Sequence, residues 1–380
     1  MSSHWPGPAR PEGLGPGWEP NCAALAIGSL PHVRPGPALE LCIESTPELV
    51  GWPQLPAAAP AENMYAQFAA GLPGLVVTAD GAYCDRRSPS YEADLERLYA
   101  AHLSWSPDAG APPPVAGPAA IGPAAIGPEL ARGLHALLDM PRERLPAGAA
   151  LKGQITGPVS FALAVTDQDR RPLLYDETLR QAATLLLRLK AAWQEWALAG
   201  SGRPTVLFLD EPYMATFGSA HFNYGPELVR QLLEAVTGGL RSTLGVHCCG
   251  NTDWTLLLGG PARIVSFDAY AHARSMALYP REVEAHLAAG GCLAWGIVPA
   301  LPQDLVGETL DSLLARFEAA VGLLVDKGID KDLLLRRALI SPSCGLRAQS
   351  EDGAARALGL CAQMSARLRG RGQRAGGEQL

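Results

Sequence analysis

Residues 244–251 read LGVHCCGN, a short apolar run that ends in polar, chemistry-bearing side chains. Its first three residues are typical of a buried β-strand, because strands covered on both faces are apolar throughout. His247 and Cys249 follow two positions apart, and such positions in a strand point to the same face. The segment therefore predicts a buried strand that presents an imidazole and a thiol together at its carboxyl end.

The same pattern recurs along the chain and predicts the fold. Eight short apolar runs are candidate strands: 23–29, 75–79, 150–156, 206–210, 244–249, 264–268, 292–298 and 337–341. Longer stretches with helical spacing lie between them, for example 129–138, 177–198, 226–240 and 309–327. Alternating strands and helices indicate a parallel α/β fold, and eight strands fit a closed (β/α)₈ TIM barrel.

Two alternatives to this assignment remain open at the sequence level. An open doubly wound sheet would also alternate strands and helices, but no G-x-G-x-x-G follows the first strand, which weakens its dinucleotide-binding version. The run 75–79 could belong to an insertion rather than to the barrel.

The length of 380 residues suits one large barrel with additions. A Pro- and Gly-rich start predicts a flexible N-terminal arm over 1–20, and the barrel domain is expected over 21–366. A second Pro- and Gly-rich stretch predicts an insertion at about 106–128, and residues 367–380 are expected to form a disordered tail.

Composition excludes several classes of partner. The net charge is −7, and basic residues cluster only briefly near the C-terminus, so nucleic acid is not an expected partner. No apolar run reaches the roughly 18 residues that span a membrane, and the start does not resemble a secretory signal. We therefore expect a cytoplasmic protein, in which the eight cysteines serve metal binding, catalysis or packing rather than disulfides.

Two further strand ends extend the His247–Cys249 pair. Cys344 follows an apolar run in ISPSCGL, and Asp268 ends another in IVSFDAY. Imidazole, thiolates and a carboxylate together suit Zn²⁺, and ligands spread over three strands favour a catalytic site over a structural one. The alternatives are a buried histidine beside packing cysteines, and an Asp268 that orients His247 without binding the metal.

Polar residues also end other strands. In DEP at 210–212, Asp210 continues a buried strand and could hold the ammonium group of an amino acid, and it is the residue we expect to be catalytic. For Glu211, a solvated turn that caps the next helix is the alternative. Gly28 and Ser29 end the first strand, where backbone N–H groups could cradle a carboxylate, although an ordinary loop is the better explanation of these two residues taken alone.

Taken together, the motifs resemble the catalytic C-terminal half of cobalamin-independent methionine synthase, within the superfamily it shares with uroporphyrinogen decarboxylase. The matching motifs are I-G-S at 27–29, E-x-M at 62–64, D-E-P at 210–212, H-x-C at 247–249, S-F-D at 266–268 and C-G-L at 344–346. They occur in the family's order and span roughly residues 22–350.

The resemblance implies a zinc site made of His247, Cys249 and Cys344, with Asp268 at the position of the family's fourth ligand, a glutamate. It also implies contacts with the amino-acid end of homocysteine from Ile27, Gly28, Ser29, Glu62 and Asp210. The implied activity is transfer of a methyl group to the thiol of homocysteine or a similar small thiol, as in methionine biosynthesis.

Three departures bear on the methyl donor. Asp268 is one methylene shorter than the family's glutamate, and the proton-donating histidine expected near 292–298 is absent. The family's N-terminal domain, which helps bind methylfolate, has no counterpart in this sequence. The chain thus resembles the short, core-only methionine synthases, and the expected donor is a methylated corrinoid protein rather than folate.

Two other functions compete with the methyltransferase. A metal-free decarboxylase of the uroporphyrinogen type would place Asp210 or Asp268 near substrate nitrogens, but it leaves the histidine and the two cysteines unexplained. A non-catalytic protein that binds zinc or thiols is the second alternative, and the two missing family residues point towards it.

Overall fold

A computed structural model describes residues 11–78, 81–107, 113, 123–219, 222 and 224–376, excluding the side chains of 371–376. Eight strands form one sheet in the order β1-β11-β10-β9-β8-β7-β5-β2, with parallel neighbours throughout. These strands are β1 Ala23–Ala24, β2 Leu49–Gly51, β5 Ala150–Thr156, β7 Thr205–Asp210, β8 Thr243–Cys248, β9 Ile264–Phe267, β10 Cys292–Val298 and β11 Ala338–Pro342. The predicted (β/α)₈ architecture is confirmed.

The two ends of the sheet meet just beyond β1 and β2. Ser29 and Gln54 form an isolated parallel bridge. The amide of Leu30 donates to the carbonyl of Gln54 at 2.9 Å, and the amide of Gln54 donates to the carbonyl of Gly28 at 3.0 Å. The extended chain after β1 therefore closes the barrel at its carboxyl end, where the predicted site residues lie.

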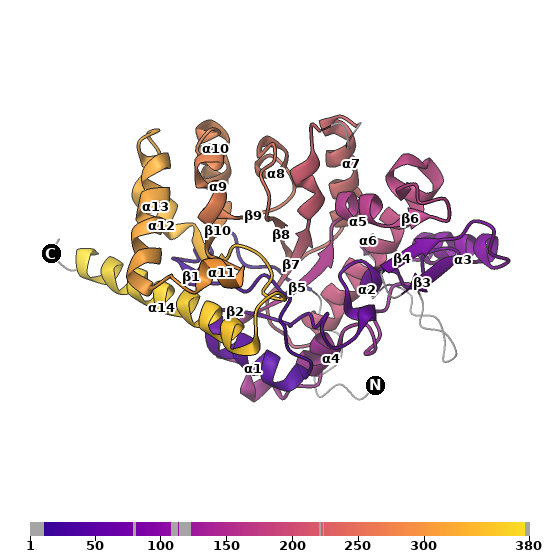
Figure 1. The fold of residues 1–380 in the computed structure, drawn as a ribbon, viewed down its shortest axis with the longest axis horizontal. Helices are drawn as coiled ribbons and strands as arrows, with labels where there is room; N and C mark the ends of the chain where they lie inside the picture. Colours follow the sequence, from indigo (N-terminus) through magenta and orange to yellow (C-terminus); the bar gives the residue numbers. More distant parts are fainter. Residues whose placement is uncertain are drawn as a thin grey trace.

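Helices cover the outside of the barrel (Figure 1). The longer ones are α1 Pro35–Ser45, α6 Glu177–Ala199, α7 Pro226–Thr237, α10 Pro280–Ala288, α12 Leu310–Val325 and α14 Glu351–Gly376. Shorter ones are α2 Ala66–Ala69, α4 Arg132–Leu138, α5 Pro158–Ala164, α8 Thr255–Leu258, α9 Ala269–Met276, α11 Pro302–Leu305 and α13 Lys331–Arg336. Short 3₁₀ turns lie at Pro60–Glu62 (η1), Arg142–Arg144 (η3), Leu173–Tyr175 (η4) and Pro212–Thr216 (η5).

Alternate residues of each strand face the barrel interior. Small and apolar interior residues form one buried cluster: Ala23, Leu25, Leu49, Ala150, Val206, Phe208, Ile264, Cys292, Ala294 and Leu339. Their sequence neighbours face outward into the larger core beneath the helices. The same alternation continues towards the carboxyl ends of the strands. The next inward-facing residues of each strand therefore line the carboxyl-terminal end of the barrel, where barrel enzymes have their sites.

The prediction of a barrel strand at 75–79 was wrong. The run 75–79 is not a barrel strand: β3 Leu75–Thr78 pairs antiparallel with β4 Gly81–Cys84, and β6 Thr166–Asp167 joins them in a separate three-stranded sheet. With α3 Tyr91–Leu103, this sheet projects from one side of the barrel, at the right of Figure 1. The barrel strand at this point is β2 instead, whose three residues are too few to show a pattern.

The N-terminal arm is described from residue 11, and there it is bound to the barrel. The carbonyl of Glu12 accepts from the amide of Thr205, and the amide of Leu14 donates to Thr243 Oγ1 at 2.8 Å. Leu14 and Trp18 pack against the interior apolar cluster. Residues 11–20 thus close the amino-terminal end of the barrel instead of extending freely, while 1–10 lie outside the described residues.

The other two predicted irregular segments fall only partly within the described chain. Of the insertion at 106–128, residues 108–112 and 114–122 lie outside the described residues, and 124–126 are buried. The predicted tail begins inside α14, whose backbone continues to Gly376. The apolar residues of this helix pack on the barrel as far as Leu368. The disordered tail stays a prediction, and 377–380 lie outside the described residues. Within the described residues, no helix is long and apolar enough to cross a membrane.

Candidate metal centre

His247 lies at the carboxyl end of β8, on the face that points into the barrel. It is 3% exposed. Its Nδ1 lies 2.9 Å from the hydroxyl oxygen of Ser266, its neighbour in the register between β8 and β9. Its Nε2 is buried and has no hydrogen-bond partner among the described residues. In metal-binding histidines, one ring nitrogen typically makes a hydrogen bond that orients the ring, and the other is left to bind the metal.

Cys249 and Cys344 complete a cluster with His247. The nitrogen and the two sulfur atoms that could bind an ion all lie within 4.8 Å of one another. Metal–ligand bonds of about 2.0–2.3 Å place the donors of one tetrahedral zinc roughly 3.5 Å apart, so little movement would bring the three to one ion. The structure thus brings these three side chains together, as predicted from the sequence. That they bind a metal stays a proposal.

The two thiols share their protons unequally. The pKa of Cys344 is lowered to about 4, chiefly by a hydrogen bond from the Cys249 thiol and further by His247. The same contact raises the pKa of Cys249. The hydrogen bond between the two thiols therefore favours ionisation of Cys344 over that of Cys249.

Cys344 is placed by the tight turn that follows β11. A methyl group on Gly345 would lie 2.1 Å from Ser29 Oγ, so a side chain there would require the Ser29 hydroxyl to move. The amide of Leu346 donates to the carbonyl of Ser29 at 2.7 Å. Of the residues predicted to bind the amino-acid end of the substrate, Ser29 therefore lies directly beside the Cys344 turn, together with its neighbours Ile27 and Gly28.

Asp268 lies near the cluster without belonging to it. Its Oδ1 accepts a hydrogen bond from the amide of Ala271 at 2.8 Å and caps the amino end of α9. Burial raises its pKa, and its charge interacts with those of His247 and Cys344. The partner that fixes His247 is Ser266 rather than Asp268. A role for Asp268 as the fourth zinc ligand remains a prediction.

Asp210 ends β7 directly beside His247, its partner in the register between β7 and β8. It is 8% exposed, and its Oδ1 is buried and has no hydrogen-bond partner within the part of the chain that the structure describes. Burial raises its pKa to about 6, against the opposing effects of Lys152 and His247. An unpaired carboxylate oxygen on the site floor can accept a hydrogen bond from a cationic group that enters the site.

Glu211 has a structural role that differs from the solvated turn considered for it. Its side chain is fully buried, and its carboxylate accepts hydrogen bonds from the amides of Val159 (3.0 Å) and Ser160 (2.7 Å). These are free amides at the start of α5, so Glu211 caps the helix that follows β5 rather than the helical turn that follows β7. Burial raises its pKa to about 7.

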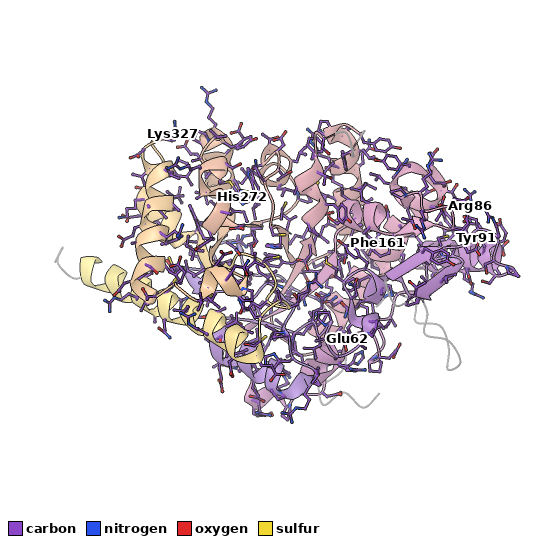
Figure 2. The ribbon with its side chains drawn as sticks, viewed as in Figure 1. Glu62, Arg86, Tyr91, Phe161, His272 and Lys327 are labelled. Carbon is purple, nitrogen blue, oxygen red and sulfur yellow. The ribbon has the colours of Figure 1, made fainter. Side chains whose placement is uncertain are left out.

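Glu62 is buried at η1, on the side of the barrel near α2 and α4 (Figure 2). Arg132 Nε lies 3.5 Å from its Oε1, and neither oxygen makes a hydrogen bond of ordinary geometry within the described chain. Burial raises its pKa to about 7, against the opposing effect of Arg132. The charge paired with Glu62 is thus that of Arg132.

Sequence reasoning missed three side chains around the cluster. Ser266 shares the interior face with Asp268, two residues on, so strand alternation alone could have identified it. Tyr65 and Tyr213 pack edge to face with ring centroids 6.3 Å apart, and the charges of Cys249 and Asp210 act on Tyr65. Nothing in the sequence signals this aromatic pair, because it joins two separate loops.

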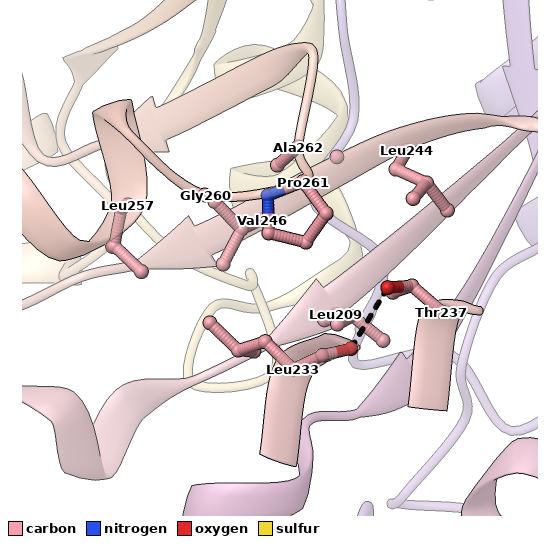
Figure 3. A pocket seen from close by; sticks show the side chains of 10 residues that line it. Leu209, Leu233, Thr237, Leu244, Val246, Leu257, Gly260, Pro261 and Ala262 are labelled. Atoms are coloured by element: carbon pink, nitrogen blue, oxygen red, sulfur yellow. Dashed lines mark hydrogen bonds between the residues drawn. The ribbon is translucent and has the colours of Figure 1, made fainter. Parts of the chain in front are cut away.

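A small cavity lies elsewhere, behind β7 and β8 (Figure 3). Leu209 and Val246 line it from the strands, and Leu233 and Leu257 line it from α7 and α8. The hydroxyl of Thr237 donates to the carbonyl of Leu233 within its own helix. The cavity is an apolar gap between barrel and helices, and it contains none of the cluster residues.

No family model matches this chain, and no curated protein matches it. Three similar solved structures are a B12-independent methionine synthase from a Shewanella species with selenomethionine, a methyltransferase from Methanosarcina mazei, and a putative vitamin-B12-independent methionine synthase from Listeria monocytogenes. Their identities are 15%, 16% and 15%, with TM-scores of 0.41, 0.37 and 0.42. The alignments cover 59%, 58% and 60% of this chain and 63%, 60% and 66% of those chains, less than two thirds of each.

Proposed function

We propose that this chain is a zinc-dependent methyltransferase that moves a methyl group to the thiol of homocysteine or a similar small thiol. The observation that carries the proposal is the cluster of His247, Cys249 and Cys344, whose donor atoms lie within 4.8 Å of one another at the carboxyl end of the barrel. Barrel enzymes place their active sites at this end.

The donor set fits zinc. One imidazole nitrogen and two sulfurs are ligands that zinc prefers, and three protein ligands leave a fourth position for substrate. Within the described chain, His247 Nε2 has no hydrogen-bond partner, and the pKa of Cys344 is lowered by Cys249 and His247, so both groups are suited to bind a cation. When bound there, zinc would keep a coordinated substrate thiol deprotonated at neutral pH, where a free thiol with a pKa of about 8.5 is mostly protonated.

The residues around the cluster would hold the acceptor. Asp210 offers its unpaired oxygen to the ammonium group, and the amides at Gly28 and Ser29 are proposed to receive the carboxylate. Ile27 and Glu62 complete the proposed contacts. These positions would place the substrate sulfur over the cluster and aim it at a methyl group brought from outside.

In the proposed reaction, the acceptor thiol first loses its proton to solvent. The sulfur then forms a bond to the methyl carbon, while the bond between that carbon and the donor breaks and its electron pair leaves with the donor. We propose a methylated corrinoid protein as the donor. Tyr65, which packs edge to face on Tyr213 and is acted on by the charges of Cys249 and Asp210, would help to restrict water at the sulfur.

The test compares variants of the cluster with a neighbouring cysteine. His247→Ala and Cys344→Ser should lose the bound zinc and lower methyl transfer to homocysteine at least ~100-fold. Cys248→Ser is the control, because Cys248 faces away from the cluster and bonds the carbonyl of Gly250. Zinc content and transfer should survive in the control. Full activity of metal-free protein would contradict the proposal, and porphyrinogen decarboxylation would favour the decarboxylase instead.

A further inference from the structure

Lys152 is a fully buried cation inside the barrel. It lies on β5, two residues beyond Ala150 of the interior apolar cluster, and its side chain is 1% exposed. Its side chain passes alongside Gly51 of β2, where a methyl group would lie in ordinary contact at 3.6 Å from Lys152 Cδ. Burying an ammonium group is costly, so a lysine in a barrel interior needs partners that compensate for the lost water.

Those partners lie at the floor of the proposed site. Lys152 Nζ donates to the carbonyl of Ile27 at 2.6 Å and to Gln154 Oε1 at 2.9 Å. It also lies 4.7 Å from the centre of the Phe208 ring. Burial lowers its pKa to about 8, so the group is mostly charged at neutral pH. The charge is therefore held directly beneath the end of β1.

The contact with Ile27 has a consequence for the next residue. In a trans peptide, the carbonyl of one residue and the amide of the next point in opposite directions. Because Lys152 draws the Ile27 carbonyl towards itself, the amide N–H of Gly28 points away from the ammonium group. A buried positive charge behind this peptide strengthens its attraction for an anion at the amide side.

The same segment is tied to the metal cluster. Gln154 packs against Gly28, where a methyl group would lie 3.0 Å from Gln154 Nε2, and that nitrogen donates to the carbonyl of Trp52 at 3.0 Å. Ser29 lies against Gly345, the residue after Cys344. Lys152 thus supports a segment that connects the interior of the barrel to the turn of one proposed ligand.

We propose that Lys152 is a positioning residue that makes residues 27–29 the carboxylate side of the acceptor site. The proposal rests on the proposed function, because it gives the acceptor thiol an amino-acid carboxylate. It distinguishes acceptors: a thiol with a carboxylate gains from the buried charge, and a thiol without one does not.

The chain offers a matched control in Lys190. This second lysine is also fully buried and donates to a single carbonyl, that of Ala125, at 3.2 Å. Burial lowers its pKa to about 7. It lies on α6, outside the barrel interior, so its removal reports the general effect of losing a buried lysine.

The experiment measures binding of two thiols to the zinc-loaded protein by calorimetry. The probes are homocysteine and homocysteamine, which is homocysteine without its carboxylate. Wild-type protein should bind homocysteine about tenfold more tightly than homocysteamine, as expected for one charge-assisted contact. In Lys152→Met and Lys152→Gln the ratio should fall to about one or two, while Lys190→Met keeps it. Gln retains a donor for Ile27, so it tests the charge if Met disturbs folding.

The outcomes distinguish the positioning role of Lys152 from the proposed methyltransferase function. An unchanged ratio in both Lys152 variants would overturn the positioning role, as would equal binding of both thiols by wild-type protein. If Lys190→Met also lost the preference for homocysteine over homocysteamine, the loss would reflect general destabilisation. That result too would overturn the positioning role of Lys152. If the ratio falls as expected but no methyl transfer occurs with any donor, the proposed function fails and the role of Lys152 in thiol binding stands.

Discussion

At the scale of single residues, His247 shows how the site is prepared for an ion. One ring nitrogen is fixed by Ser266, and the other is buried with no partner among the residues that the structure describes. The cost of leaving Nε2 unpaired would be recovered on binding a cation, and the fixed ring loses little freedom in doing so.

Ser266→Ala should weaken zinc binding about 10- to 100-fold while leaving the three ligands in place, because the ring loses its orienting partner. Competition with a chelator of known affinity measures this. Ser341→Ala is the control, since Ser341 is equally buried on β11 and its hydroxyl has no partner within the described chain. Equal loss of affinity in both variants would argue that Ser266 only fills space.

Glu62 predicts a pH dependence of stability. Its pKa is near 4.5 before burial and about 7 in the folded chain. Between these values the folded state keeps a proton that the unfolded state has released, so the free energy of unfolding falls as pH rises. Glu62→Gln stays neutral and should lack this loss. Relative to the variant, the free energy of unfolding of the wild type should fall by on the order of 2–3 kcal/mol from pH 4.5 to 7, as measured by urea unfolding. If the unfolding free energies of the two proteins changed with pH in parallel, the raised pKa of Glu62 would be contradicted.

The residues of the cluster were predictable because strand alternation is a local rule. It placed His247 and Cys249 on one face, and strand ends placed Cys344 near them. Lys152 was not predictable, because a charged residue within an apolar run looks like an edge or a surface position. Its burial is compensated by the Ile27 carbonyl and the Phe208 ring, which come from the segment after β1 and from β7.

At the scale of elements, the N-terminal arm is held by an arginine. Arg263 donates to the carbonyls of Leu14, Gly15, Pro16 and Trp18, and its guanidinium lies 5.9 Å from the centre of the Trp18 ring. These contacts satisfy carbonyls that a short irregular segment cannot pair by itself. The arm therefore belongs to the folded barrel.

Arg263→Ala should lower the free energy of unfolding by about 2–4 kcal/mol, because it releases the arm from the barrel. Arg230→Ala provides the comparison, since Arg230 makes only an exposed ion pair with Glu227 at 2.8 Å, and it should change stability by less than ~1 kcal/mol. Denaturant unfolding measures both. Similar effects for the two arginines would mean that the arm adds nothing to stability.

The elements show where sequence patterns fail. Both β2 and β3 are short and apolar, but β2 is fully buried in the barrel and β3 is half exposed in a hairpin. The difference arises from the neighbours each strand finds, which no local pattern encodes. The longer strands β5 and β10 were predicted with the bounds that the structure gives, because seven buried residues leave a clear signal.

At the scale of the whole molecule, barrel closure brings the site together. The bridge between Ser29 and Gln54 closes the sheet, and the bond from Leu346 to Ser29 joins the last strand to the first. Residues far apart in the chain thus meet at one rim: Asp210, His247 and Cys344 with the end of β1. The closed barrel was predictable from strand count, but the contact of Ser29 with Gly345 depends on the shift between strands at closure.

The most direct test of the central claim is X-ray absorption at the zinc edge, with and without homocysteine. Zinc-loaded protein should show two sulfur donors and one imidazole from the chain, with a light atom in the remaining position. Addition of homocysteine should raise the number of sulfur donors to three, because the substrate thiolate takes the open position. A sulfur count that stays at two with homocysteine bound, or zinc held by oxygen and nitrogen alone, would contradict the account.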